Sequence, residues 1–275
     1  ISITALGGLS IGGDLVANGG SSVSGSSYMG TSMNVQLKTN ATSLTVGGEN
    51  DGQLGKISGA NLTLYGSGIY QFKGANDYSG TTVVAETSTL RLAAANVIPD
   101  LSSVTLSSTS NILELGDFSE TIGNLSGSGI VRSVGLSNSV LITGKEAIMA
   151  TFNGLIQDGT GTVHITKEGT GTWNLTKANS FSGLMTVTAG KVNITNALAL
   201  GTDAQGTVVA SGAALEVQGS MTVANEALTI SGTGISSGGA LRLVSGDVNW
   251  SGPIMASATT PRMVIATGSW NQTGD

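Results

Sequence analysis

Short runs in which apolar and polar residues alternate recur along most of the chain. Typical examples are residues 62–64 (Leu-Thr-Leu), 163–165 (Val-His-Ile) and 241–243 (Leu-Arg-Leu). A period of two places one side chain in a core and the next in solvent, which is the pattern of a half-buried strand. No stretch of useful length has the 3.6-residue period of an amphipathic helix. We therefore expect an all-β chain with very little helix.

The alternation between residues 215 and 243 predicts which side chains form the core. Six apolar residues are expected to point inward: Leu215, Val217, Leu228, Ile230, Leu241 and Leu243. The polar residues between them, Glu216, Thr229 and Arg242, are expected to point outward. Replacing an inward leucine by alanine should then cost roughly 2–5 kcal/mol, and Glu216→Ala well under about 1 kcal/mol.

Clusters of Gly, Ser, Asn and Thr separate these runs and are typical of tight turns. The Asn-Gly pairs that favour two-residue hairpins are scarce, with residues 18–19 and 153–154 as the main examples. An antiparallel sandwich, in which successive strands are joined by hairpins, is therefore disfavoured.

The chain repeats itself after about one hundred residues. Residues 66–80 align with residues 169–183 at an offset of 103, so that Tyr70 matches Trp173 and Tyr78 matches Phe181. The copies span roughly 40–140 and 140–245, and a third begins at 246–275. Such a repeat is too long for one coil of a parallel β-helix but fits four or five coils of roughly 20–25 residues. We expect a single continuous β-solenoid over residues 1–275.

Composition excludes several classes of function. There are 42 Gly residues, yet 39% of the chain is hydrophobic, which is enough to drive folding. A net charge of −6 disfavours nucleic acid as a partner. The absence of cysteine rules out disulfides and thiolate chemistry. No apolar run approaches the ~20 residues of a membrane helix, so we expect membrane attachment only through a segment outside this sequence. The sequence starts at Ile1 without Met, a charged n-region or an apolar h-region, so it contains no visible signal peptide, and we expect it to be a piece of a longer precursor.

Candidate catalytic and metal-binding residues are few. His164 is the only histidine and is expected to be a solvated residue on an outer strand face, where the preceding repeat has Asn61. Among the dispersed acidic residues only Asp117 and Glu120 lie close together. Residues 47–52 (Gly-Gly-Glu-Asn-Asp-Gly) lack a repeating calcium-binding pattern and are expected to form a turn. We therefore predict no catalytic, cofactor-binding or metal-binding residues, and no cofactor.

Two kinds of repeated residue are expected to have structural roles. Asn76 and Asn179 recur at equivalent turns and are expected to adopt a left-handed conformation, with their amides bonded to neighbouring backbone. The pairs Tyr70 with Trp173 and Tyr78 with Phe181 are expected to pack in the core or turns. A sugar-binding aromatic surface is the alternative for these pairs.

Three segments in a fixed order resemble a known family. They are residues 152–159, 166–172 and 178–183, the last reading Ala-Asn-Ser-Phe-Ser-Gly. The order and spacing are similar to the autotransporter-associated β-strand repeat, also called the passenger-associated transport repeat. Leu184 departs from that pattern, which usually continues with Gly or Thr. The resemblance implies a right-handed parallel β-helix in a passenger domain at the bacterial cell surface, on the extracellular face of the outer membrane.

The resemblance also implies a function. In that family such repeats serve as a non-catalytic structural stalk that helps export and folding. The partners expected are neighbouring solenoid coils of the same longer chain, with end-to-end self-association as a further possibility. Two alternatives stay open: a self-associating extracellular filament, sheath or matrix protein, and a β-helical carbohydrate-active enzyme.

Overall fold

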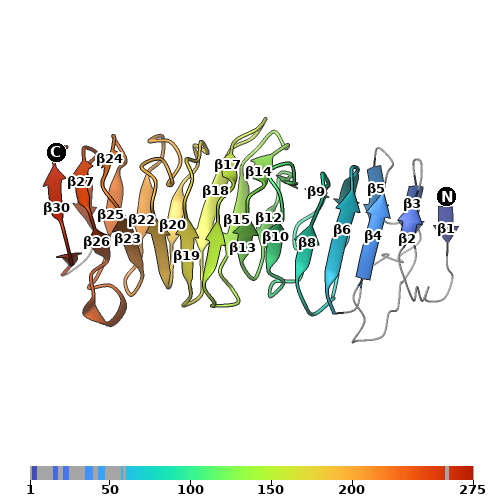
Figure 1. The fold of residues 1–275 in the computed structure, drawn as a ribbon, viewed down its shortest axis with the longest axis horizontal. Coiled ribbons are helices and arrows are strands. Elements are labelled where there is room, and N and C mark those ends of the chain that lie inside the picture. The colour runs from blue at the N-terminus through green and yellow to red at the C-terminus, as the bar shows by residue number, and fades with distance from the viewer. Residues whose placement is uncertain are drawn as a thin grey trace.

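In the computed structural model the chain forms a rod of stacked parallel strands (Figure 1). The structure describes residues 60–257 and 260–274, Ile57, and the backbone of five strands nearer the N-terminus. The strands lie across the long axis and follow one another along it in chain order. Within the described part the helical content is one 3₁₀ turn, η1 (Ile235–Ser237). No helix in that part is long and apolar enough to cross a membrane. The expected all-β parallel solenoid is therefore confirmed.

The strands belong to four sheets. The 12-stranded sheet contains β2 (Leu15–Ala17), β4 (Val35–Thr39), β6 (Leu62–Gly66), β8 (Thr82–Val84), β10 (Val104–Leu106), β13 (Leu125–Gly127), β16 (Ala150–Phe152), β19 (Thr172–Leu175), β21 (Lys191–Ile194), β23 (Ala214–Gln218), β26 (Leu241–Ser245) and β29 (Met263–Ile265). The 8-stranded sheet contains β1 (Ser2–Thr4), β3 (Ser21–Ser24), β5 (Ser43–Val46), β7 (Ile69–Phe72), β9 (Thr89–Leu92), β11 (Ile112–Leu115), β14 (Ile130–Ser133) and β17 (Leu155–Gln157).

The other two sheets lie in the C-terminal part of the chain. The 7-stranded sheet contains β12 (Ser119–Thr121), β15 (Ser139–Thr143), β18 (Val163–Lys167), β20 (Met185–Val187), β22 (Thr207–Val209), β25 (Leu228–Ile230) and β28 (Ile254–Ala256). The 3-stranded sheet contains β24 (Met221–Val223), β27 (Asp247–Trp250) and β30 (Ser269–Gln272). Each of its strands follows a strand of the 12-stranded sheet, as each strand of the 8-stranded sheet after β1 does earlier in the chain.

Each turn of the solenoid adds one strand to the 12-stranded sheet. Register partners in successive turns lie as close in sequence as Ile112 and Ile130, 18 residues apart, and as far as Val35 and Leu62, 27 residues apart. The strands keep their register while the connecting turns absorb the difference in length. Loops of different size can therefore be inserted without disturbing the stack.

The internal repeat is out of phase with these turns. Tyr70 lies on β7 of the 8-stranded sheet, whereas its counterpart Trp173 lies on β19 of the 12-stranded sheet. In the same way β8 belongs to the 12-stranded sheet and its counterpart β20 to the 7-stranded sheet. A repeat that is not a whole number of turns places equivalent residues on different faces of the rod. The same sequence unit is thus presented in two directions.

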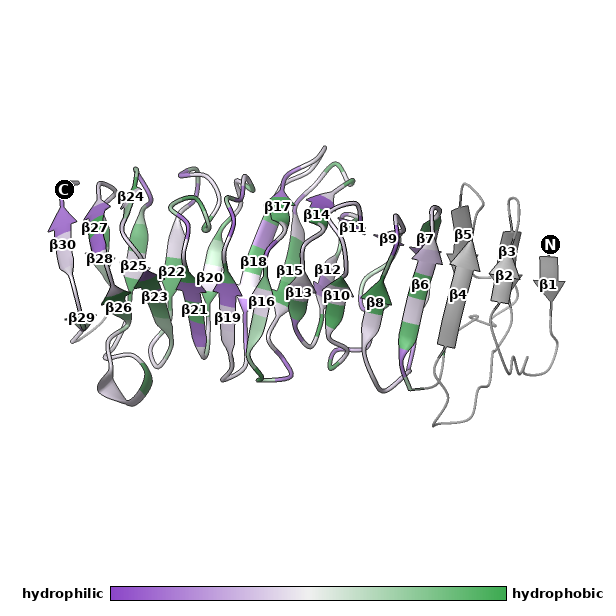
Figure 2. Ribbon diagram, in the orientation of Figure 1, coloured by the Kyte–Doolittle hydropathy of each residue, from purple (hydrophilic) through white to green (hydrophobic). Residues whose placement is uncertain are grey.

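Stacked apolar side chains fill the interior along the described part of the rod, and Figure 2 shows the apolar positions recurring from strand to strand. On the 12-stranded sheet the inward positions include Val104, Leu125, Val192, Leu215 and Leu241, all fully buried. Leu215, Val217, Leu228, Ile230, Leu241 and Leu243 are at most 5% exposed, so the predicted core register is confirmed.

The repeated aromatic residues also belong to this core. Tyr70, Trp173, Tyr78 and Phe181 are each at most 1% exposed. The Trp173 indole Nε1 donates to the carbonyl of Leu125, 3.0 Å away and 48 residues earlier. These aromatics hold adjacent turns together from within, and they do not form a sugar-binding surface.

The core register makes a stability prediction. We expect Leu215→Ala to lower the free energy of unfolding by about 2–5 kcal/mol, because a fully buried side chain is replaced by a cavity. Thr229→Ala, on the outer face of β25, should cost well under about 1 kcal/mol. Chemical denaturation of both variants followed by circular dichroism is the measurement. Equal losses would contradict the assignment of inner and outer faces.

Candidate functional site

Asn76 and Asn179 are buried, and the side chain of each one joins its own turn to the turn before and the turn after. The Asn179 Oδ1 accepts the N–H of Ile156 in the turn before, at 2.8 Å, and its Nδ2 donates to the carbonyl of Ala199 in the turn after, at 2.6 Å. Asn76 does the same between Ile57 and Val97, at 2.7 Å on both sides. An amide has both a donor and an acceptor, which suits a corner where the backbone ladders are interrupted. The predicted bonding to neighbouring backbone is confirmed.

The predicted left-handed conformation of these two asparagines is wrong. Neither Asn76 nor Asn179 is among the described residues with positive φ. Their repetition reflects the three-turn hydrogen bonding instead of backbone strain. The non-glycine residues that do adopt positive φ include Ser236 and Ser237, at φ of 49° and 58°, in the loop described below.

His164 replaces Asn61 in a structural role. The Nδ1 of His164 accepts the backbone N–H of Leu184, at 3.0 Å, just as the Oδ1 of Asn61 accepts that of Thr81, at 2.8 Å. A Cβ added to Gly183 would lie 2.8 Å from His164 Cγ, and one added to Gly80 2.2 Å from Asn61 Oδ1. The repeated glycine therefore makes room for this contact. His164 lies on the outer face as predicted, although it is half-buried instead of fully solvated.

This hydrogen bond also bears on catalysis. Because Nδ1 is the acceptor, the neutral imidazole carries its proton on Nε2. A general base of the Ser-His-Asp type needs the opposite tautomer, with Nδ1–H bonded to a carboxylate. The Nδ1 atom of His164 is thus occupied by its hydrogen bond to the backbone of Leu184.

Asp117 and Glu120 do not form a pair of catalytic carboxylates. Asp117 is exposed and accepts the N–H of Ser137. Glu120 is fully buried and accepts the N–H groups of Val97 and Ile98, at 3.1 and 2.7 Å. The Asp117 carboxylate therefore lies in solvent, whereas the Glu120 carboxylate lies in the core. Within the described residues no group of three or more His, Cys, Asp or Glu side chains could hold a metal ion, and residues 47–52 lie outside them.

Glu120, Glu226 and Lys167 are buried, a feature that the alternation did not predict. Burial raises the pKa of Glu120 to about 7, an effect that hydrogen bonds from Ile98 and Val97 oppose. Burial raises the pKa of Glu226 to about 7 as well, opposed by the hydroxyl of Thr207. Burial lowers the pKa of Lys167 to about 8, and its ammonium donates to the carbonyls of Glu168, Gly169 and Ala189. None of these three side chains lines either of the two cavities described for this chain.

Two charged triads lie on the outer faces of the rod. In the first triad, on the 8-stranded sheet, Arg91 and Arg132 flank the carboxylate of Glu114, whose side chain is 1% exposed. In the second triad, on the 12-stranded sheet, Lys191 and Arg242 flank Glu216. Glu114 and Glu216 are counterparts in the internal repeat, so the phase shift places the two triads on different faces.

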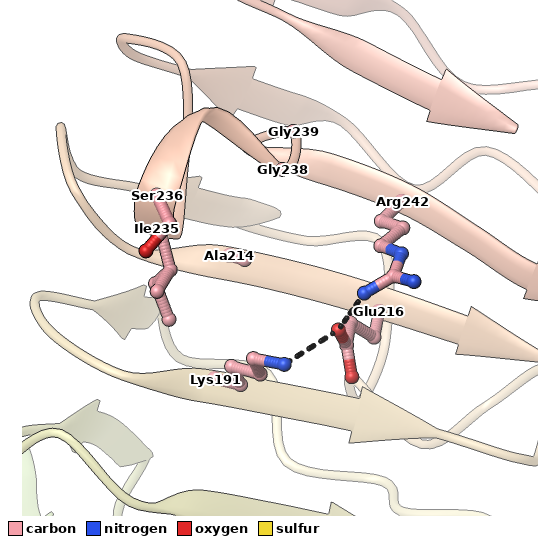
Figure 3. A pocket seen from close by; sticks show the side chains of 8 residues that line it. All are labelled: Lys191, Ala214, Glu216, Ile235, Ser236, Gly238, Gly239 and Arg242. Carbon is pink, nitrogen blue, oxygen red and sulfur yellow. Dashed lines mark hydrogen bonds and ion pairs between the residues drawn. The ribbon is translucent and has the colours of Figure 1, made fainter. Parts of the chain in front are cut away.

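The second triad lies beneath a loop and lines a cavity of about 230 Å³ (Figure 3). The Oε1 of Glu216 accepts from Lys191 Nζ at 3.0 Å and from Arg242 Nη1 at 3.3 Å. The remaining lining comes from Ala214 on β23 and from Ile235, Ser236, Gly238 and Gly239 in the loop. Glu216 points outward, as expected, but it is only 9% exposed because the loop and the two cations cover it.

The loop between β25 and β26 is an insertion in one turn of the solenoid. Leu215 and Leu241 are register partners 26 residues apart, whereas Leu241 and Met263 in the next turn are 22 apart. Arg262 fastens the loop by donating to the carbonyl of Ser237, at 2.8 Å. The Gly- and Ser-rich composition of this loop indicated a turn, but no sequence signal indicated that the loop folds back over Glu216.

The geometry of Glu216 changes its expected contribution to stability. Glu216→Ala would leave Lys191 and Arg242 without their shared carboxylate, and both side chains are about one third exposed, at 31% and 38%. Because water can hydrate the two cations, we now expect a loss of about 1 kcal/mol, between that of Thr229→Ala and that of Leu215→Ala.

Comparison with known proteins identifies the repeated unit. Residues 62–86 and 165–194 match the family model of the passenger-associated-transport-repeat. No curated protein and no solved structure matches the chain. The matched segments contain the equivalent features described above, including Asn76 with Gly80 and Asn179 with Gly183. The resemblance inferred from the sequence is therefore confirmed for both segments.

Proposed function

We propose that this chain, which carries two passenger-associated transport repeats, is a non-catalytic structural stalk of a bacterial protein exported to the cell surface. The observation that supports the proposal is the combination of these repeats with a solenoid whose 12-stranded sheet continues from turn to turn. A rod of this kind holds what is attached to it at a distance set by the number of turns. The passenger-associated transport repeats support the export of this rod to the cell surface.

A second feature supports association with further coils. β28, β29 and β30 each pair with a neighbour on one side only. Three apolar side chains of this turn are considerably exposed: Met255 at 51%, Met263 at 36% and Ile265 at 47%. An open strand edge with apolar side chains favours the addition of another strand layer. We propose coils of the same longer chain as that layer, in preference to a second copy.

Electron microscopy of the full-length protein, released from its producing cells, tests this proposal. Rods of uniform, finite length that remain separate at high concentration are expected. Periodic filaments of indefinite length would show that the open edge pairs with another molecule, as in a sheath or matrix protein. Surface labelling of intact cells with an antibody against this segment should be positive, and labelling only after lysis would contradict export.

The absence of catalysis is a separate prediction. Purified protein incubated with pectin, alginate or glycosaminoglycans is expected to release no reducing or unsaturated ends, because His164 and Glu120 are engaged with backbone groups. His164→Asn should leave folding and surface display unchanged, since Asn61 performs the same contact in the other repeat. Reproducible release that disappears in Asp117→Ala would establish an enzyme and overturn the stalk proposal.

A further inference from the structure

We propose that the cavity beneath the loop between β25 and β26 binds one acidic sugar residue of the uronic acid class. The cavity measures about 230 Å³, smaller than the ~300–1,000 Å³ of sites for drug-sized ligands, so a single ring is the appropriate size. It combines apolar, cationic and acceptor groups in one place (Figure 3). The proposal goes beyond the stalk function and does not depend on it.

The cavity is built before any ligand arrives. The guanidinium of Arg262 holds the carbonyl of Ser237, and the N–H of Gly239 donates to the carbonyl of Thr233, at 2.8 and 2.9 Å. Ser236 and Ser237 keep positive φ angles, a conformation that costs energy and persists only where the surroundings impose it. A loop fixed in this way loses little conformational entropy on binding.

The charges of the cavity favour a carboxylate. Lys191 and Arg242 both donate to a single oxygen, Oε1 of Glu216, and the three groups together carry one net positive charge. Both cations retain further N–H donors, three in total on an ammonium and five on a guanidinium, and their side chains are 31% and 38% exposed. A ligand carboxylate can bond to these donors while Glu216 keeps its present partners.

The other groups of the cavity favour a sugar over a simple anion. Glu216 is an acceptor at the centre of the site, and a simple anion offers it no hydrogen-bond donor. A uronic acid brings a carboxylate for the cations and adjacent hydroxyl donors for Glu216. Ile235, which Figure 3 shows reaching from the loop toward Lys191, and Ala214 supply an apolar wall for the ring face. An acidic peptide has no comparable hydroxyl donors beside its carboxylate.

The first triad is an internal control. Arg91, Glu114 and Arg132 have the same charges and the same stacked arrangement on β9, β11 and β14. None of the three lines either of the cavities described for this chain. If charge alone were sufficient, both triads would bind a uronate equally well. If the cavity is required, only the second triad binds.

Calorimetric titration of the full chain with glucuronate and galacturonate tests the proposal, with glucose, acetate and N-acetylaspartate as probes that each lack part of the chemistry. We expect a uronate to bind at least about tenfold more tightly than these three probes. Arg242→Gln should weaken uronate binding about tenfold or more, because it removes a charged donor. Ala214→Leu, which fills the cavity without changing its charge, should weaken it similarly.

Arg132→Gln is the matched control and should leave uronate binding within about twofold of the parent chain. Thermal denaturation of each variant checks that it is folded. Failure of the parent chain to bind either uronate would overturn the proposal, as would unchanged binding by folded Arg242→Gln and Ala214→Leu. Equal binding of acetate would indicate a plain anion site, and tighter binding of N-acetylaspartate a protein partner; both results would overturn the sugar assignment.

Discussion

Trp173→Ala is expected to lower the free energy of unfolding by about 3–5 kcal/mol, the range for removing a buried tryptophan. Trp173 is 1% exposed, and its indole reaches past the small side chain of Ala150 to bond the carbonyl of Leu125. Alanine would leave a cavity that spans more than one turn and would leave that carbonyl without its donor. Denaturation by guanidinium chloride, followed by far-ultraviolet circular dichroism, measures the loss.

Trp270→Ala is the control for this prediction. Trp270 is only partly buried and stacks on Trp250 with ring centroids 5.5 Å apart. Its removal should cost about 0.5–1.5 kcal/mol beyond the apolar area lost, the scale of one aromatic pair. Equal losses from the two substitutions would show that Trp173 does not join the turns in the way described.

Raising the pH from 4.5 to 7 is expected to destabilise the protein. Burial raises the pKa values of Glu120 and Glu226 from 4.5 to about 7, so across this interval the folded state holds protons that the unfolded chain has released. The free energy of unfolding therefore falls as the pH rises, by about 3 kcal/mol for each group. Denaturation midpoints measured at pH 4.5, 6 and 7.5 give the slope.

Lys167 has the opposite effect at higher pH. Burial lowers its pKa from 10.5 to about 8, so between these values the unfolded chain binds the extra proton and stability rises with pH. We expect a minimum of stability between about pH 7 and pH 8. Glu120→Gln should reduce the slope between pH 4.5 and 7. An unchanged slope in Glu120→Gln would contradict the assignment.

Much of the fold follows from local pattern. The alternation around Leu215 and Leu241 predicts strands and the side of each strand that is buried, because successive side chains of a strand point to opposite faces. The repeat of Tyr70 as Trp173 predicts stacked units and a shared core role. The same repetition correctly indicated that Asn76 and Asn179 bond to neighbouring backbone, and it missed only their conformation.

The tertiary structure alone decided which residues meet across turns. Turn lengths between 18 and 27 residues set which residue of one coil lies beside which residue of the next, and no local pattern encodes these lengths. For this reason the sequence places Glu216 on an outer face but does not reveal the loop that covers it, or Lys191 and Arg242 on either side. The burial of Glu120 escaped prediction for the same reason, since its partners Val97 and Ile98 belong to the preceding turn. The sequence determined the strands, the core and the repeat, whereas the cavity and the buried charges exist only because separate turns are stacked in register.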